Sequence, residues 1–390
     1  MKKLAIITTR FPWPLTNGFA NKNYWLVRGL SESYEISLHV IQSKNVAEED
    51  FNKIKEYCKS IHIYRPNFFD ILIGLANSLF FDLPIQLALF RSFRAKKSID
   101  ADILNSAIVL CSVIRGAQYL KSYDGPLICD LADSLGQVYI RDSFKFRGLK
   151  KFIYREEGRR MLRYEKTVVS QADQTLFFNP REASYHSNKS VSVVPHGVDS
   201  RLLDLDISNS NYADGVVIFG KMNFEPNVNA VEWFVDKVLP SLPMHIKLYV
   251  VGADPGARIL KLANQSPRVV VTGFVDDPYP SLRGAIANIC SIQMGGGIQN
   301  KVIEGLAIGA LGLVSPLAAD SMPEIENSGL IVCDGPDEWV EVIRAADANR
   351  KNFESNRAIG RVYARKHFSW EVYINFVKKS ISLATINQGN

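Results

Sequence analysis

The sequence predicts an α/β protein made of two doubly wound parallel-sheet domains in tandem. Short apolar runs alternate with helix-like segments along the whole chain, which is typical of strands that are buried on both faces. This alternation begins again after residue 215. A chain of 390 residues is long enough for two domains. Its 47% hydrophobic and 22% charged residues are the balance of a globular protein.

In the first half, seven short runs rich in Ile, Val and Leu are expected to form strands, each followed by a helix or a loop. They are Leu4–Thr8, Ile36–Ile41, Ser60–Tyr64, Asp102–Asn105, Leu127–Asp130, Thr175–Phe178 and Val191–Val194. The next segment, Arg201–Gly215, is polar and rich in turn-forming residues. We therefore expect it to be an interdomain linker.

The second half repeats the pattern with six further runs. They are Val216–Phe219, Ile246–Val251, Val269–Thr272, Ala287–Cys290, Gly312–Val314 and Leu330–Cys333. The expected domains are 1–196 and 197–369, and a last helix at about 370–390 is open to either half, including packing back on the first. Ligands of such sheets bind at the carboxyl ends of the strands. A cleft between the two domains is thus the expected active site.

Composition narrows the class of protein. The 46 Lys and Arg residues against 40 Asp and Glu make the chain mildly basic, with a net charge of +6. Its five cysteines are scattered without a CxxC pair. This pattern points to a reducing compartment and against a zinc site. The apolar run after the first lysines is too short for a signal peptide, so we expect it to be a strand.

One apolar segment, Phe68–Phe90, is long enough to span a bilayer. It also contains Asp70, Asn77, Asp82 and Pro84, and an acidic residue in mid-membrane is costly. A spanning helix is therefore the weaker alternative. We expect two helices, buried or lying at a surface, that are separated at residues 82–84.

The strongest motif is a glycine run, Gly295–Gly297, that follows a predicted strand and precedes a helix start near Gln299. Glycines let a ligand approach the backbone closely, and the start of a helix attracts an anion. Lys301 adds a cation for phosphate, and Glu304 lies on the same helical face, where it can accept hydrogen bonds from sugar hydroxyls. The pattern favours a nucleoside diphosphate over an ordinary glycine turn.

These residues carry a resemblance to a known family. The run GGGIQNKVIEGLAIGALGLVS resembles the nucleotide-sugar motif of the retaining glycosyltransferases of family 4, in the branch with a GGG-x-QNK-xx-E motif. FGKMNFEPNVNAVEWF, VVVTGFVDDPYPSL and VSVVPHGVD are similar to other parts of that family, and the likeness covers nearly the whole chain. It implies the GT-B fold, in which two Rossmann-like domains face a central cleft. It also implies that the first domain binds the acceptor and the second the nucleotide sugar.

The resemblance implies roles for individual residues of the second domain. Lys221, Lys301 and Glu304 are expected to be catalytic through contacts with the departing diphosphate and the ribose. Many members carry a second cation near Glu225, and we hypothesise that Lys301 supplies it here. Gly296 stands where many members have a first glutamate. The other expected donor-binding residues are Gly220, Asn223, Phe274, Gly296, Gly297, Ile298, Gln299 and Asn300.

Some of these positions have a structural alternative. Phe274 follows a predicted strand end, so it could pack beside a base or belong to the core. His196, at the domain junction, is also expected to bind the donor, although a lone histidine is more often structural than part of a cleft.

In the first domain, Gly18 and Lys22 are expected to face the diphosphate or the acceptor, although Gly18 could simply belong to an Asn-Gly turn before a helix. Asp133 could orient an acceptor hydroxyl or stabilise positive charge on the sugar. Equally, Asp133 or Ser134 could cap the next helix. For Asp130 we favour capping or packing.

The segment Arg141–Lys166 holds ten Lys and Arg residues against four acidic ones, with aromatic residues between them. Such a segment could lie on an anionic membrane surface, form a solvated charged face over a core stripe, or recruit nucleic acid. We favour the membrane surface and expect no nucleic-acid partner.

Together these features predict an enzyme that moves a sugar from a UDP- or GDP-sugar to a saccharide or lipid-linked acceptor, with retention of configuration. It would act in bacterial cell-surface polysaccharide biosynthesis and need neither a cofactor nor a metal, because lysines and a helix dipole would stabilise the leaving group. We expect a cytoplasmic protein, or one bound peripherally to the inner face of the plasma membrane. The alternatives are a nucleotide-sugar epimerase of the same fold and a non-catalytic nucleotide-sugar-binding or scaffold protein. A dinucleotide oxidoreductase is disfavoured, because no GxGxxG follows the first strand.

Overall fold

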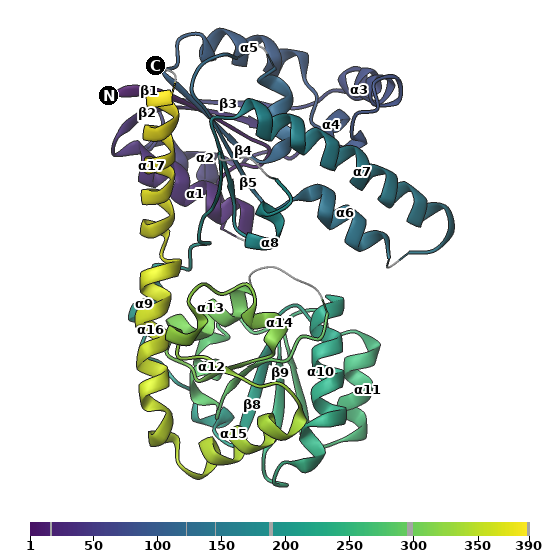
Figure 1. The fold of residues 1–390 in the computed structure, drawn as a ribbon, viewed down its shortest axis with the longest axis vertical. Coiled ribbons are helices and arrows are strands. Elements are labelled where there is room, and N and C mark those ends of the chain that lie inside the picture. Colours follow the sequence, from purple (N-terminus) through teal and green to yellow (C-terminus); the bar gives the residue numbers. More distant parts are fainter. Residues whose placement is uncertain (16–17, 122, 145, 187–189, 295–298, 388–390) are drawn as a thin grey trace. The chain divides into compact units, whose positions relative to one another are not determined.

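The computed structural model describes residues 1–15, 18–121, 123–144, 146–186, 190–294 and 299–387. The chain divides into two compact units (Figure 1). Unit 1 comprises Met1–Val194 and Tyr373–Asn390, and unit 2 comprises Pro195–Val372. Each unit is a parallel sheet covered by helices on both faces, the arrangement that continuous apolar strands require.

The sheet of unit 1 has seven parallel strands in the order β3-β2-β1-β4-β5-β6-β7. Its strands are β1 (Lys2–Thr8), β2 (Tyr34–Ile41), β3 (Ser60–Tyr64), β4 (Ile108–Ser112), β5 (Leu127–Ala132), β6 (Gln174–Phe177) and β7 (Val191–Val193). Its helices are α1 (Gly18–Ser31), α2 (Glu48–Lys55), α3 (Phe68–Phe80), α4 (Ile85–Ala88), α5 (Phe93–Ile103), η1 (Ile114–Tyr119), α6 (Leu135–Ser143), α7 (Gly148–Gln171), α8 (Pro180–Ala183) and most of α17 (Trp370–Asn387).

One predicted strand is wrong. Residues 102–105 lie at the end of α5 and in the turn after it, and the strand is β4, whose five residues are all buried. This segment is helical rather than extended because Ala95, Ile99 and Ile103 recur at intervals of four and form the buried face of α5. The expectation of two helices in the 68–90 segment is confirmed by α3 and α4.

The sheet of unit 2 has six parallel strands in the order β10-β9-β8-β11-β12-β13. They are β8 (Gly215–Phe219), β9 (Lys247–Val251), β10 (Val269–Gly273), β11 (Asn288–Cys290), β12 (Gly312–Val314) and β13 (Ile331–Val332). The helices are α9 (Ser200–Asp204), η2 (Ser210–Tyr212), α10 (Glu225–Lys237), η3 (Leu239–Ser241), α11 (Ala257–Gln265), α12 (Tyr279–Gly284), α13 (Asn300–Ala307), α14 (Pro316–Ala319), η4 (Ile325–Asn327), α15 (Pro336–Ala348), η5 (Arg350–Phe353) and α16 (Glu354–Phe368).

The predicted linker, Arg201–Gly215, is also a correction, because this segment is part of unit 2. It forms α9 and η2, and Leu202 and Leu203 are buried in the core of that unit. The ring of Tyr212 packs edge-on against Tyr249, with centroids 4.7 Å apart. The polar residues of this segment face solvent, while its few apolar residues dock on the sheet.

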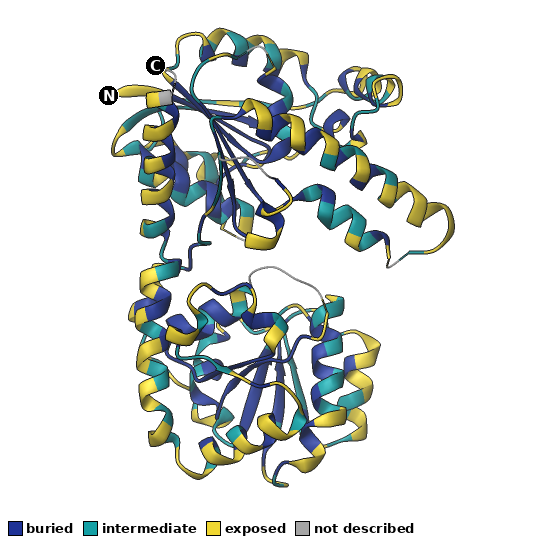
Figure 2. Cartoon of the chain, in the orientation of Figure 1, coloured by how far each residue is buried: buried dark blue, intermediate teal, exposed yellow. Residues whose placement is uncertain are grey.

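The strands form the buried interior of each unit, and the helices expose their outer faces (Figure 2). In unit 1, α17 packs on α1: a side chain at Gly29 would collide with Ile374, at 2.7 Å from its Cβ. The final helix thus completes the core of unit 1, although residues 195–372, which precede it in the chain, form unit 2.

Candidate functional site

Most of the predicted donor residues of unit 2 that the structure describes lie at the carboxyl edge of its sheet. The strand order runs outward in opposite directions from β8 and β11, so the pair β8/β11 is the topological switch point. Loops that leave two such strands diverge and open a crevice, where ligands of these sheets bind. The loop after β8 contains Gly220, Lys221 and Asn223, and the loop after β11 leads to α13.

Two glycines let the loops after β8 and β9 approach each other. Gly220 has φ of 144° and Gly252 has φ of 146°, values that L-residues rarely adopt. A Cβ on Gly252 would lie 1.9 Å from the carbonyl oxygen of Gly220. Glycine is therefore required here by both conformation and space.

Lys221 and Asn223 are exposed and share one partner. The Lys221 Nζ lies 3.4 Å from Oδ2 of Asp254, and Asn223 Nδ2 donates to the same oxygen over 3.4 Å. Both contacts are long and solvated, so they hold these side chains only weakly. The two groups can turn toward an anion at the edge of the sheet.

Lys301 is positioned by a residue outside the predicted site. Asn227, in the first turn of α10, accepts a hydrogen bond from Lys301 Nζ on its Oδ1 and donates from Nδ2 to the Lys221 carbonyl over 2.9 Å. Asn227 is buried, whereas Lys301 is half-buried in the first turn of α13. An ammonium has three donors, and Asn227 takes one of them. No other acceptor among the described residues contacts this ammonium, so its two remaining donors can face a ligand.

Glu304 follows one turn later on α13 and is half-buried. Burial raises the pKa of its carboxyl to about 7, and the nearby Asp199 adds to the shift. Gln299 and Asn300 lie at the start of α13. Backbone N–H groups in the first turn of a helix have no acceptor within the helix and attract anions. The predicted residues Gly296, Gly297 and Ile298 lie outside the described residues.

Phe274 follows β10 and is 72% exposed. The alternative that placed it in the core is therefore wrong. Gly273 precedes it with φ of 70° and accepts a hydrogen bond from Gly252 N over 3.0 Å, so this strand end is tied to the Gly220–Gly252 contact. The aromatic ring stands at the carboxyl edge of the sheet.

His196 packs against Trp370, with ring centroids 5.3 Å apart. A side chain at the neighbouring Gly197 would collide with the same indole, at 2.1 Å. This packing places His196 in the junction between β7 and α9. It agrees with the structural alternative for this residue.

In unit 1, Lys22 is only 1% exposed and does not present a free cation. Its Nζ lies 2.8 Å from Oδ2 of Asp130, and the hydroxyl of Tyr373 donates to the same oxygen. The three side chains join α1, β5 and α17 inside the unit. Lys22 therefore neutralises Asp130. Because Lys22 is buried in this pair, it cannot contact a ligand directly. Asp130 packs as expected.

Asp133 lies directly after β5 and its side chain is exposed. Ser134, rather than Asp133, caps α6, because its hydroxyl accepts from Gln137 N over 3.3 Å. Ala132 has φ of 62°, a strained conformation for a residue with a Cβ. This kink turns the chain at the carboxyl end of β5 and leaves Asp133 accessible. Gly18 begins α1, is exposed, and has open space where a Cβ would stand.

Asn23 is a second positioning residue that the sequence analysis missed. It lies buried at the switch point of unit 1, between β1 and β4. Its Nδ2 donates to Thr8 Oγ1 over 2.8 Å, and its Oδ1 accepts from Ser112 Oγ over 2.7 Å. In each unit, one buried amide thus bridges two segments at the switch point: two strand ends in unit 1, and the loop after β8 and α13 in unit 2. The signal in the sequence was an asparagine near the start of a helix that follows a strand, at the sixth position of α1 and at the third of α10. An asparagine at such a position looks like an ordinary helix residue, so neither was singled out.

The basic segment 141–166 forms parts of α6 and α7. Several of its arginines are already in ion pairs: Arg159 and Arg163 pair with Asp82 after α3, and Arg160 pairs with Glu156. Among the described residues, no helix is long and apolar enough to cross a membrane. The residues that the structure describes also contain no group of three or more His, Cys, Asp or Glu side chains that could hold a metal ion.

Comparison with known proteins bears on fold and family. Residues 213–348, within unit 2, match the family model described as glycosyl transferases group 1. No curated protein sequence matches the chain. Over 97% of this chain, HepE of Anabaena in complex with UDP aligns with a TM-score of 0.66 and 11% identity, covering 99% of that chain.

Two further solved structures are similar. Sucrose-phosphate synthase from Thermosynechococcus elongatus aligns over 97% of this chain and 98% of its own, with a TM-score of 0.65 and 16% identity. WaaG, a glycosyltransferase involved in lipopolysaccharide biosynthesis, aligns over 98% of this chain and 99% of its own, with a TM-score of 0.60 and 12% identity. The two parallel-sheet units and these likenesses establish the GT-B fold.

Proposed function

We propose that the protein is a glycosyltransferase that moves a sugar from a nucleoside-diphosphate sugar to a saccharide or lipid-linked acceptor, with retention of configuration. The observation that carries this proposal is the Lys301–Asn227 contact, which holds a cation at the start of α13, at the switch point of unit 2. The family match covers this unit. HepE, of similar fold, has been solved with UDP and with UDP-glucose.

The diphosphate is bound by Lys301, Lys221 and the backbone N–H groups at the start of α13. Glu304 accepts hydrogen bonds from the ribose hydroxyls, and Phe274 packs against the base. In this arrangement the cations and the helix dipole stabilise the negative charge that develops on the leaving diphosphate. A metal ion is not needed for that role.

In the reaction, the bond between the anomeric carbon and the diphosphate oxygen breaks. The acceptor oxygen bonds to the same carbon on the same face, and the acceptor proton passes to the leaving diphosphate. Asp133, accessible at the end of β5, orients the acceptor hydroxyl or stabilises positive charge on the sugar. We assign the product to cell-surface polysaccharide synthesis.

The test begins with the full chain and a panel of UDP, GDP, dTDP and CMP. A ligand that binds the native state raises the melting temperature, so one nucleoside diphosphate should raise it selectively, and Lys301→Ala should make the rise much smaller. Lys261→Ala, an exposed lysine of α11, is the matched control. If no nucleotide shifts the melting temperature, the proposed nucleotide-sugar donor is wrong, and if the shift persists in Lys301→Ala, the donor site is not where we place it.

The nucleotide that binds is then supplied as its glucose, galactose and mannose conjugates, with saccharide acceptors. Release of the diphosphate only when an acceptor is present, in the presence of a chelator, supports metal-independent transfer. Proton NMR of the product then gives its anomeric configuration. Conversion of the donor to a new nucleotide sugar without an acceptor would indicate an epimerase, and tight binding without turnover would indicate a non-catalytic protein.

A further inference from the structure

Helix α3 of unit 1 has its polar face inside and its apolar face outside. Phe69 is 73% and Phe80 84% exposed, whereas the buried residues of the helix are Asp70, Gly74 and Ser78. Every residue of α3 is described, and none on its exposed face is charged. That face is formed by Phe68, Phe69, Leu72, Ile73, Ala76, Leu79 and Phe80. Water-soluble helices show the opposite pattern.

Specific contacts fix this orientation. Asp70 forms a capping box with Asn67 and accepts from Phe93 N over 3.3 Å. A Cβ on Gly74 would lie 2.7 Å from the Cα of Ala88, so only glycine allows the helix to pack this closely on α4. Ser78 Oγ donates to Gly74 O over 3.0 Å and to Pro84 O over 3.2 Å. Rotating the helix to bury its aromatic face would break its contacts with Phe93, Ala88 and Pro84.

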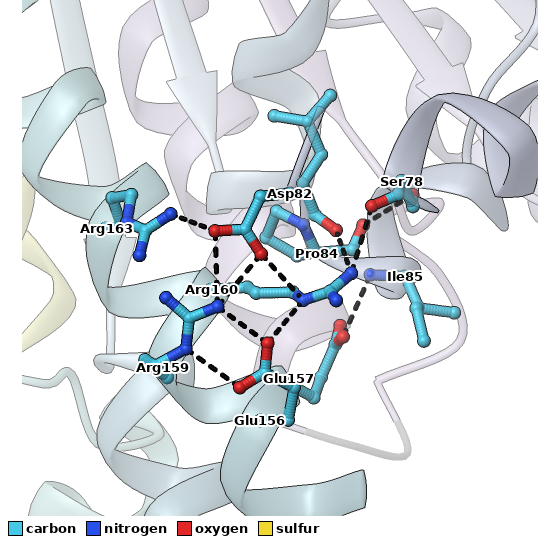
Figure 3. A network of polar contacts seen from close by, with 10 residues as sticks. Ser78, Asp82, Pro84, Ile85, Glu156, Glu157, Arg159, Arg160 and Arg163 are labelled. Atoms are coloured by element: carbon cyan, nitrogen blue, oxygen red, sulfur yellow. Dashed lines mark hydrogen bonds and ion pairs between the residues drawn. The ribbon is translucent and has the colours of Figure 1, made fainter. Parts of the chain in front are cut away.

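The end of α3 is anchored to α7 by a polar network (Figure 3). Arg160 Nη1 donates to Ser78 O over 2.9 Å, and Arg159 and Arg163 pair with Asp82. The Glu157 carboxylate accepts from the backbone N of Ile85, at the start of α4, over 2.9 Å. The apolar face is therefore held on a rigid base.

The tip of the α6–α7 hairpin carries a second exposed apolar cluster, formed by Phe144, Leu149, Phe152 and Ile153. Lys150 and Lys151 lie over the rings of Phe146 and Phe144, at 3.9 and 5.5 Å from the centroids. This hairpin projects from the same side of unit 1 as α3 in Figure 1. Exposed Arg94 and Lys97 of α5 add cations to the unit.

We propose that the exposed face of α3 inserts into the headgroup region of an anionic lipid bilayer, with the tip of the α6–α7 hairpin as a second contact. Thirteen residues of helix are about 20 Å long, too short to cross a bilayer of about 30 Å but sufficient to lie in its surface. The lysines and arginines beside the apolar residues match anionic headgroups. This inference is independent of the proposed transferase activity.

Lipid is favoured over another protein because the exposed apolar residues at the tip of the hairpin lie beside Lys150 and Lys151. Aromatic and aliphatic residues combined with lysine and arginine are the composition that binds to an anionic membrane interface. Three of the four arginines on the central part of α7, namely Arg159, Arg160 and Arg163, are paired with Asp82 or Glu156. The basic contribution to binding therefore comes mainly from the tip of the hairpin, at Lys150 and Lys151.

The test is co-sedimentation of the full chain with vesicles of phosphatidylcholine, with and without phosphatidylglycerol. We expect binding to the anionic vesicles. The variant Phe69→Ser/Leu72→Ser/Phe80→Ser should lower the partition coefficient roughly 30-fold or more, since each lost side chain removes buried apolar area. The matched control replaces the exposed apolar residues Leu260, Ile359 and Val362 of unit 2 with serine, and it should bind like the native chain.

Lys150→Glu/Lys151→Glu provides a second readout if the serine variant misfolds. It should weaken binding to anionic vesicles several-fold and leave the melting temperature unchanged. The proposal is overturned if the native chain does not bind anionic vesicles, or if the unit 2 control loses as much binding as the α3 variant. It is also overturned if the α3 substitutions only convert an oligomer to a monomer, because the face then belongs to a protein interface.

Discussion

Asn227 Oδ1 accepts a hydrogen bond of 2.5 Å from Lys301 Nζ, although the two residues are 74 positions apart. Through its amide nitrogen, Asn227 also holds the loop after β8. One buried side chain thus sets the distance between the two segments that diverge from the switch point. Asn23 plays the corresponding part in unit 1, between Thr8 and Ser112.

Replacing Lys301 with alanine should weaken the binding of the nucleoside diphosphate by one to two orders of magnitude, because a charged hydrogen bond contributes about 1.5–3 kcal/mol. Asn227→Leu keeps the cation but removes its orientation, so we expect a smaller loss, about threefold to tenfold. Isothermal titration of both variants and of the double variant measures their coupling. Strictly additive losses would contradict the positioning role of Asn227.

Glu304 should make donor binding depend on pH. Its raised pKa of about 7 means that the carboxyl is largely protonated below that pH and ionised above it. The carboxylate accepts stronger hydrogen bonds from two ribose hydroxyls than the protonated acid does, because the acid is neutral and one of its oxygens carries a proton. The affinity for UDP-glucose should therefore rise between about pH 6 and about pH 8. The diphosphate diester of that ligand does not titrate in this range. In Glu304→Gln the profile should be flat, and a persisting slope would assign the titration to another group.

Phe274→Ala should weaken binding of the nucleotide about tenfold, because stacking of an aromatic ring on a base is worth about 1–3 kcal/mol. The exposed ring contributes little to the core, so the melting temperature of the free protein should hardly change. Competition by inorganic pyrophosphate separates base from phosphate contacts. If pyrophosphate binding fell as much as nucleotide binding, Phe274 would not contact the base.

Lys22→Met should destabilise unit 1 by about 3–5 kcal/mol, because it leaves the buried Asp130 carboxylate without its cation. The double variant Lys22→Met/Asp130→Leu should recover most of this loss. Urea unfolding followed by tryptophan fluorescence measures both. As the control, Lys96→Met removes the exposed Lys96–Asp100 pair and should change stability by less than about 1 kcal/mol. Equal losses at both sites would show that burial of the Lys22 pair has no energetic consequence.

Local patterns were sufficient for much of the fold. Continuous apolar strands such as β1 and β5, and the Pro84 break between α3 and α4, depend on residues that are neighbours in the chain. The same holds for the glycine run and Lys301, whose spacing is local. The strand predicted at 102–105 failed because a short apolar run fits either a strand or the buried side of a helix. Only packing against the sheet chose the helix for that run.

Neighbouring residues were enough to predict the fold class and the loops that carry polar residues at strand ends, because periodicity and motif spacing are local properties. Three features could be seen only in the tertiary structure. Lys22 forms a buried ion pair with Asp130, Asn227 orients Lys301, and α3 turns its aromatic face outward. The physical reason is that a side chain's charge, exposure and partner depend on segments far away in the chain, which are brought together only when strands pair and helices pack.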